Sequence, residues 1–195
     1  MKKFLSILLV ALLSFGIVAC NGVGVAAATS INQNELSLKL KKIFEKDVVK
    51  KIMDGKKIND LVKDAYDKMS ADDREKALEQ IPGISLDPKY FATEDSTYAW
   101  IAEAAKSSVK HAIDNGELTQ EQIDQAKGML VLMGISLPDI KVEKGISDDD
   151  ITKLCDAFLD VADRVTNPET LKLLGIDIND PEAIEDLTKS FNFGS

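Results

Sequence analysis

Apolar side chains recur at helical spacing along most of this chain, whereas strict alternation of apolar and polar residues is nearly absent. Spacings of three and four residues place side chains on one face of an α-helix, while alternation is typical of a half-buried strand. The clearest apolar stripe runs over three helical turns and comprises Ile58, Leu61, Val62, Ala65, Tyr66 and Met69. The sequence therefore predicts an all-α fold.

Capping residues mark where the helices begin. The predicted starts are Ser70 with Asp73, Thr119 with Gln122, Ser147 with Asp148, Asp149 and Asp150, Asn167 before Pro168, and Asp180 before Pro181. A side-chain oxygen at such a position accepts an unpaired backbone N–H, and proline is tolerated in the first helical turn. A long helix is predicted from about residue 96 to 115, ended by Gly116. These signals predict a single compact bundle of seven or eight helices.

Two features concern how helices bend or end. In the first helix, Leu36, Leu40 and Ile43 share one face that Phe44 leaves, which indicates a bend near 45–47 or packing on two sides.

A Gly-Ile phrase follows a predicted helix at 83–88, 134–138 and 175–181. Glycine adopts the left-handed conformation that ends helices, and the isoleucine can pack back on the last turn. Because the spacings are unequal, we interpret shared helix-end chemistry and not a solenoid repeat. Residues 135–142 alternate enough for a short extended piece.

The N-terminus has the layout of a secretory signal peptide. Two lysines, Lys2 and Lys3, precede an apolar run from Phe4 to Val18 that is short for a membrane span. The run ends in Ile17-Val18-Ala19-Cys20, which resembles the lipobox of bacterial lipoproteins. The resemblance covers about twenty residues. It implies cleavage before Cys20, a diacylglyceryl group on the Cys20 sulfur and acylation of the new amine.

This interpretation divides the chain into a signal peptide (1–19), a lipid-anchored tether (20–34) and one helical domain (35–195). It predicts a location in the cell envelope, on the non-cytoplasmic side of a bacterial membrane. Two alternatives stay open. Cleavage after Ala28 would release a secreted protein, and an uncleaved segment 4–28 would act as a weak anchor.

The charge of the chain is unevenly distributed. Loss of Lys2 and Lys3 from 24 basic residues leaves 22 against 33 acidic ones, a net charge of −11. Residues 35–57 carry a net +4 and residues 58–195 a net −15. Since nucleic-acid binding depends on neutralising phosphates with cations, no nucleic-acid partner is expected. The candidate membrane-surface residues are Lys39, Lys41, Lys42, Lys46, Lys50, Lys51, Lys56 and Lys57. The alternative is that these lysines pair with the acidic body.

Strong catalytic signatures are missing from the sequence. Ser107-Ser108-Val109-Lys110 matches a Ser-x-x-Lys pattern, but it falls mid-helix and its Lys-Thr-Gly partner motif is absent. We interpret the acids at 148–150 as a first helical turn and not as a calcium loop. Cys155, the last cysteine, lies on an apolar face and is predicted to be buried. No metal and no cofactor are expected.

The region around 90–111 is the most aromatic part of the mature chain. The candidate partner-binding residues are Tyr90, Phe91, Tyr98, Trp100 and His111. We favour a core role for Trp100 and His111, because large aromatic residues are mostly buried. An exposed stripe that binds a partner is the alternative.

The sequence therefore predicts a membrane-anchored, non-catalytic helical module that binds another protein. One alternative is docking on the membrane surface through the lysine-rich first helix. Two further alternatives are an enzyme of unfamiliar type that uses acidic residues and a carrier with an apolar cavity.

Overall fold

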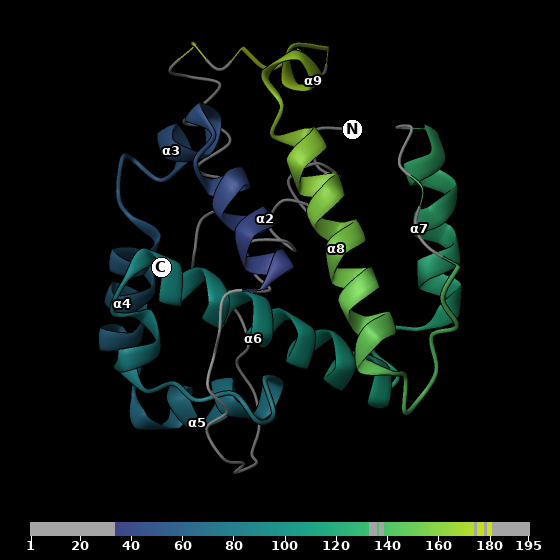
Figure 1. Ribbon diagram of the computed structural model, residues 1–195, viewed down its shortest axis with the longest axis horizontal. Helices are drawn as coiled ribbons and strands as arrows, with labels where there is room; N and C mark the ends of the chain where they lie inside the picture. The colour runs from purple at the N-terminus through teal and green to yellow at the C-terminus, as the bar shows by residue number, and fades with distance from the viewer. Residues whose placement is uncertain (1–33, 133–135, 137–138, 174, 178, 181–195) are drawn as a thin grey trace.

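The computed structural model describes residues 34–132, 136, 139–173, 175–177 and 179–180 (Figure 1). Within these ranges the chain forms α-helices and one short 3-10 helix, and no strand. The elements are α2 (Glu35–Phe44), α3 (Asp47–Ile52), α4 (Ile58–Lys68), α5 (Ala71–Gln80), η1 (Pro88–Phe91), α6 (Glu94–Asp114), α7 (Gln120–Leu132), α8 (Asp148–Val165) and α9 (Pro168–Leu173). The predicted all-α bundle is confirmed.

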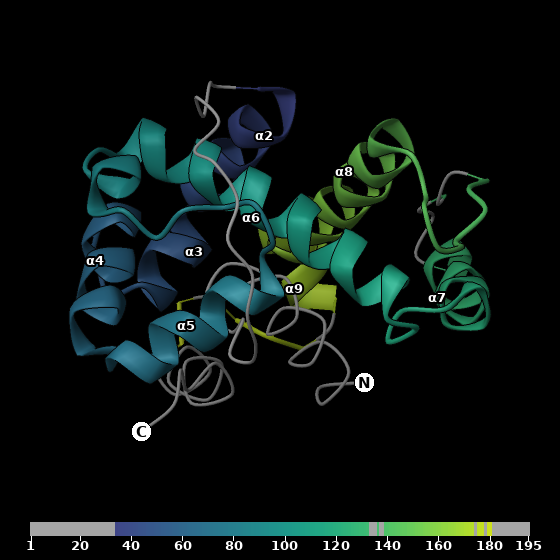
Figure 2. The same cartoon turned by 90° about the horizontal axis from the view of Figure 1, so that it is seen from below.

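The long helix α6 is the centre of the fold. It crosses the molecule in both views, with α4 and α5 beside its first half and α7 beyond its C-terminal end (Figures 1 and 2). Helices α2 and α8 pack on α6 and on each other. Both sides of α6 are buried, because Ile101 and Val109 lie on one side and Trp100 and Ala104 on the other. Helix α6 is therefore a central helix packed on two faces.

An apolar stripe on α8 supplies much of the core. Ile151, Leu154, Cys155 and Val165 are all buried, at the spacing that keeps them on one helical face. They join residues of α2, α6 and η1 in one apolar cluster. Burial of such a contiguous set is the main favourable term in folding, so the cluster fixes α2 and α8 on α6.

The capping predictions are confirmed wherever the structure describes them. Ser70 forms a capping box with Asp73, and Ser147 caps α8 by accepting the N–H of Asp150 at 3.1 Å. Thr119 accepts the N–H of Gln122 at 3.4 Å. The side chain of Asn167 accepts the N–H of Glu169 at 2.9 Å. The helix predicted to begin after Asp180 falls within residues 181–195, which lie outside the described residues.

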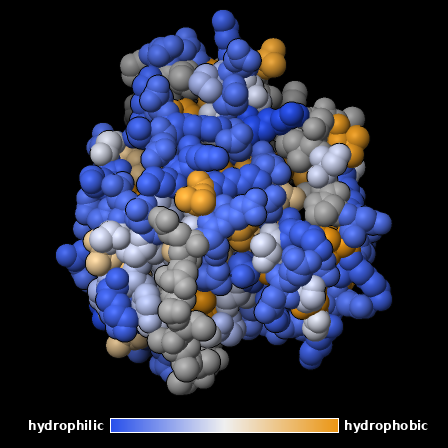
Figure 3. Space-filling view, viewed as in Figure 1, coloured by the Kyte–Doolittle hydropathy of each residue, from blue (hydrophilic) through white to orange (hydrophobic). Residues whose placement is uncertain are grey.

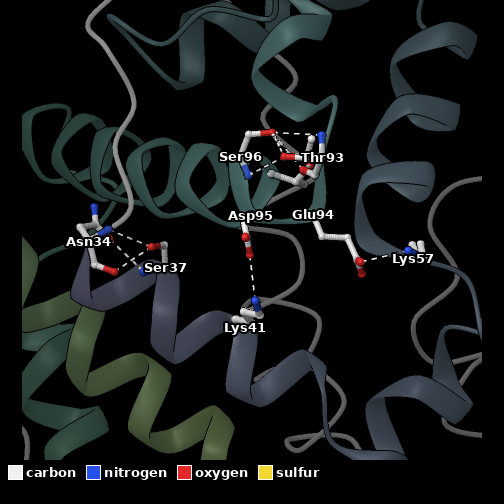
Figure 4. A network of polar contacts seen from close by, with 9 residues as sticks. Asn34, Ser37, Lys41, Lys57, Thr93, Glu94, Asp95 and Ser96 are labelled. Atoms are coloured by element: carbon white, nitrogen blue, oxygen red, sulfur yellow. Dashed lines mark hydrogen bonds and ion pairs between the residues drawn. The ribbon is translucent and has the colours of Figure 1, made fainter.

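One helix start differs from the prediction, and the cap of another helix was not predicted. The long helix begins at Glu94 and not at about 96, because Thr93 is its cap and forms a capping box with Ser96 (Figure 4). Asn34 caps α2 in the same way with Ser37. The first helical region is broken between Phe44 and Asp47, so of the two alternatives for this region the structure shows the bend.

Helix ends follow the Gly-Ile chemistry at two of the three predicted places. Gly83 and Gly175 have φ of +84° and +74°, the left-handed region. Ile176 is buried, and its N–H donates to the Leu171 carbonyl at 2.9 Å, so the chain folds back on the end of α9. Gly134 lies outside the described residues. Of segment 135–142, residues 136 and 139–142 are described and are not a strand.

The face shown in Figure 3 is mostly hydrophilic, with apolar residues in separate spots. In the described part of the chain, the large exposed apolar side chains are Leu38, Val131 and Leu173. No helix in those ranges is long and apolar enough to cross a membrane.

Candidate functional site

A cleft of about 620 Å³ opens beside the beginning of the folded body. The start of α2 forms one wall, α8 forms another, and Lys106 of α6 also lines it. The lining residues are Asn34, Glu35, Leu36, Lys106, Ser136, Asp149, Thr152, Lys153, Asp156, Ala157 and Asp160. Most of these residues are polar or charged, so the cleft suits a polar partner group better than an apolar one.

Local helix chemistry sets the α2 wall. The Asn34 side chain accepts the N–H of Ser37 at 2.9 Å, which starts the helix. Its amide nitrogen also donates to Glu103 Oε1 of α6 at 2.7 Å. One asparagine therefore caps α2 and ties its first turn to α6.

Helical spacing sets the α8 wall. Asp149, Thr152, Asp156 and Asp160 follow one another by three or four residues, so their side chains share one face of α8. The opposite, apolar face of α8 is buried in the core. Core packing thus turns the acidic stripe outward into the cleft.

Lys39 joins the two walls. Its Nζ lies 2.7 Å from Asp156 Oδ1 and 2.6 Å from Asp160 Oδ1, and its side chain is 25% exposed. Burial would lower the pKa of Lys39, but the hydrogen bonds with Asp156 and Asp160 outweigh it and raise that pKa. The cation thus stays charged between two carboxylates that would otherwise repel each other.

Two further lysines that line the cleft are also paired. Lys153 lies 2.5 Å from Asp149 and 3.1 Å from Asp150, and Lys106 lies 3.4 Å from Glu103. The floor includes Leu36 and Ala157, which are buried. The cleft is therefore lined by side chains of both charges together with a few apolar ones, and such a lining can bind charged and hydrogen-bonding groups of a partner.

Half of the predicted membrane-surface lysines pair with acids of the body. In addition to Lys39, Lys41 lies 2.9 Å from Asp95 and Lys57 lies 3.1 Å from Glu94, both in the first turn of α6 (Figure 4). Lys46 lies 2.8 Å from Asp163. For these four lysines the structure favours the alternative of pairing with the acidic body.

The other four lysines of that set differ among themselves. Lys51 donates to Asn179 Oδ1 at 3.4 Å. Lys42, Lys50 and Lys56 are exposed, and they make no ion pair with any residue that the structure describes.

The predicted aromatic set belongs mainly to the core. Trp100 is 5% exposed, its Nε1 donates to the Ser85 carbonyl at 2.8 Å, and its ring meets Phe91 edge-on at 5.6 Å. Tyr98 is also buried, 5.8 Å from Phe44 between ring centroids. Phe91, Tyr98 and Trp100 therefore cannot form the exposed stripe that was the alternative.

Two members of that set are half-buried. Tyr90 packs at the edge of the core, below Lys89, whose Nζ lies 4.8 Å from the centre of the Tyr90 ring. His111 lies in the last turn of α6, with Nε2 2.8 Å from Asn115 Nδ2. Neither residue lines the cleft.

The residues considered for catalysis in the sequence make ordinary contacts within the fold. In α6, Ser107 Oγ donates to the Pro82 carbonyl at 2.8 Å, and Lys110 lies 2.7 Å from Asp148. Cys155 is buried as predicted, and burial raises the pKa of its thiol to about 12. No group of three metal-ligating side chains occurs among the residues that the structure describes.

The acids at 148–150 form the first turn of α8, as predicted. Hydrogen bonding to Lys110 lowers the pKa of Asp148, and a hydrogen bond from Ser147 lowers that of Asp150. Both carboxylates therefore stay ionised at the positive end of the helix dipole.

Comparison with known proteins returns no match to a family model, a curated protein or a solved structure. The lipobox resemblance lies outside the described residues.

Sequence reasoning did not identify the cleft. Lys39 and Asp156 are 117 positions apart, and only the packing of α2 against α8 brings them together. The acidic spacing on α8 was the available signal, but carboxylates are so frequent in this chain that the spacing did not stand out.

Proposed function

We propose that this chain is a lipoprotein of the bacterial cell envelope, anchored through Cys20 on the non-cytoplasmic side. Its helical body acts as a non-catalytic interaction module, and the polar cleft is its contact surface. One observation supports this proposal above the others: the cleft is lined by Asn34, Glu35 and Leu36, the first residues of the described body. The contact surface therefore adjoins the point where the tether enters the fold.

The chemistry of the cleft supports binding over catalysis. Acid–base catalysis relies on carboxyl groups with shifted pKa values, free to exchange protons with a substrate. Here Asp149, Asp156 and Asp160 are each held by a lysine at 2.5–2.7 Å. Charged side chains that line a cleft can instead meet complementary charges of a partner.

Site-specific photocrosslinking in the native host tests the contact surface. A benzophenone amino acid replaces Thr152 in the cleft or, as a control, Lys76, an exposed residue of α5. We expect one discrete covalent adduct from position 152 and none from position 76. The same adduct from both positions, or none from position 152, would contradict the proposed surface.

Fractionation tests the anchor separately. The wild-type chain is expected in the membrane fraction and the Cys20→Ser variant outside it, because the serine cannot form the thioether. A wild-type chain found in the culture medium would support cleavage after Ala28 instead. Equal membrane retention of both chains would favour the uncleaved anchor.

A further inference from the structure

We infer that the anchored body is oriented on the bilayer, with Lys42, Lys50 and Lys56 toward anionic headgroups and its acidic remainder away from them. This inference rests on the proposed lipid anchor. The anchor provides the attachment, and the charge distribution of the body provides the orientation.

Neighbouring lysines of residues 35–57 differ in their contacts with the body. The segment holds three Lys-Lys pairs, at 41–42, 50–51 and 56–57. In each pair one lysine bonds to the body: Lys41 to Asp95, Lys51 to Asn179 and Lys57 to Glu94. The other lysine of each pair is exposed and makes no ion pair within the described ranges. Three outward cations thus lie at the end of α2, at the end of α3 and in the turn after α3.

The net charge of residues 35–57 contrasts with that of the rest of the molecule. Residues 35–57 carry a net +4, whereas residues 58–195 carry −15. Glu45, Asp47 and Asp54 are also exposed near the three lysines and weaken their field. Four lysines of this segment are held by acids of the body, so its remaining charges nearly balance. The segment is still less acidic than residues 58–195, so an anionic surface repels it less than it repels the rest of the body.

The electrostatic attraction of a membrane acts only over a short range. At physiological ionic strength the potential of an anionic membrane decays over about 8 Å, so only the part of a protein that touches the surface responds to it. The 14 residues from Cys20 to Gln33 can span at most roughly 50 Å when extended, while α2 is roughly 15 Å long. The tether is therefore long enough for Lys42, Lys50 and Lys56 to reach the headgroups.

The experiment uses the full lipidated protein on floated vesicles. One set contains phosphatidylglycerol and phosphatidylcholine, and the other contains phosphatidylcholine alone. Lysines are acetylated with a water-soluble ester, and the rate at each lysine is measured by peptide mass spectrometry. Lys76 and Lys144, both exposed on the body, are the internal controls.

We expect the labelling of Lys42, Lys50 and Lys56 to slow at least threefold on the anionic vesicles relative to the controls. The protection should disappear on neutral vesicles and in 0.5 M salt. Equal rates on both lipids, equal protection of Lys76 and Lys144, or protection that persists at high salt would overturn the orientation. Failure of the protein to float with either vesicle would instead show that the anchor is absent.

Discussion

Trp100 shows how a single residue resolves the main ambiguity of the sequence. A tryptophan needs apolar surroundings for its rings and an acceptor for its N–H. The core around Phe91 provides the first, and the Ser85 carbonyl provides the second. The side chain therefore stabilises the contact between α6 and the segment before η1 and is not available to a partner.

Removal of this ring should be costly. Trp100→Ala is expected to lower the free energy of unfolding by about 3–5 kcal/mol, because it leaves a cavity in the core. Urea titration followed by circular dichroism measures the loss. Tyr90→Ala, at a half-buried neighbour, is the control and should cost less than half as much. An equal loss for both variants would contradict the core role of Trp100.

The buried thiol of Cys155 makes the free energy of unfolding depend on pH in the alkaline range. Burial raises the pKa of its thiol from 9.0 to about 12 in the folded protein. A group with a raised folded pKa stabilises the fold below its unfolded pKa, so its contribution is lost as pH rises from about 9 towards 12. Burial also raises the pKa of Tyr98, from 10.0 to about 12, which acts in the same direction.

The variant Cys155→Ala separates the two groups. Between pH 8 and pH 10.5 the wild type should lose about 2 kcal/mol more unfolding free energy than the variant, since only the unfolded thiol ionises in that window. Urea titrations of both proteins at the two pH values give the difference directly. Identical losses would show that the folded thiol ionises as easily as the unfolded one.

At the scale of elements, what could be predicted from the sequence depended on how local the cause was. The caps at Ser70 and Ser147 and the break after Phe44 follow from residues within one or two turns, and the structure shows all three. The start of α6 was placed too late, because Thr93 and Ser96 form a capping box without the acidic residue that usually marks one.

The cleft could not be predicted because its walls meet only through packing. Asn34 and Glu103 are 69 positions apart, and their hydrogen bond exists only when α2 lies on α6. For the same reason the sequence could not decide whether the lysines of residues 35–57 face a membrane or pair with the acidic body, and in the structure Lys39 pairs with acids of α8. Periodicity identifies the face of a helix that is buried, but it does not identify which helix covers it.

The bridge between α2 and α8 gives a prediction at this scale. Lys39→Met should lower the free energy of unfolding by about 1 kcal/mol at low salt, a partly exposed ion pair being worth no more. The loss should shrink in 0.5 M sodium chloride, which screens the interaction. Thermal and urea unfolding at both salt concentrations measure it.

Lys42→Met is the matched control. It lies on the same helix, is exposed and makes no ion pair within the described ranges, so no comparable loss is expected. If both variants lost the same stability at low salt, helix propensity or general charge would explain the effect, and the Lys39 bridge would not.

At the scale of the whole molecule, an apolar N-terminal sequence precedes an acidic helical body, and the first described residues of that body line its polar cleft. Phe91, Tyr98 and Trp100 are buried in the core. Ion pairs hold four of the eight lysines in residues 35–57. The surface that remains for contact is polar and charged, which suits the proposed role of an anchored interaction module.

Intact mass spectrometry of the protein extracted from its native membranes tests the central claim most directly. The account predicts a 176-residue chain that begins at Cys20 and carries the mass of a diacylglyceryl group, with or without an amide-linked acyl chain. An unmodified chain that begins at Thr29, or a full 195-residue chain that retains Met1, would contradict it.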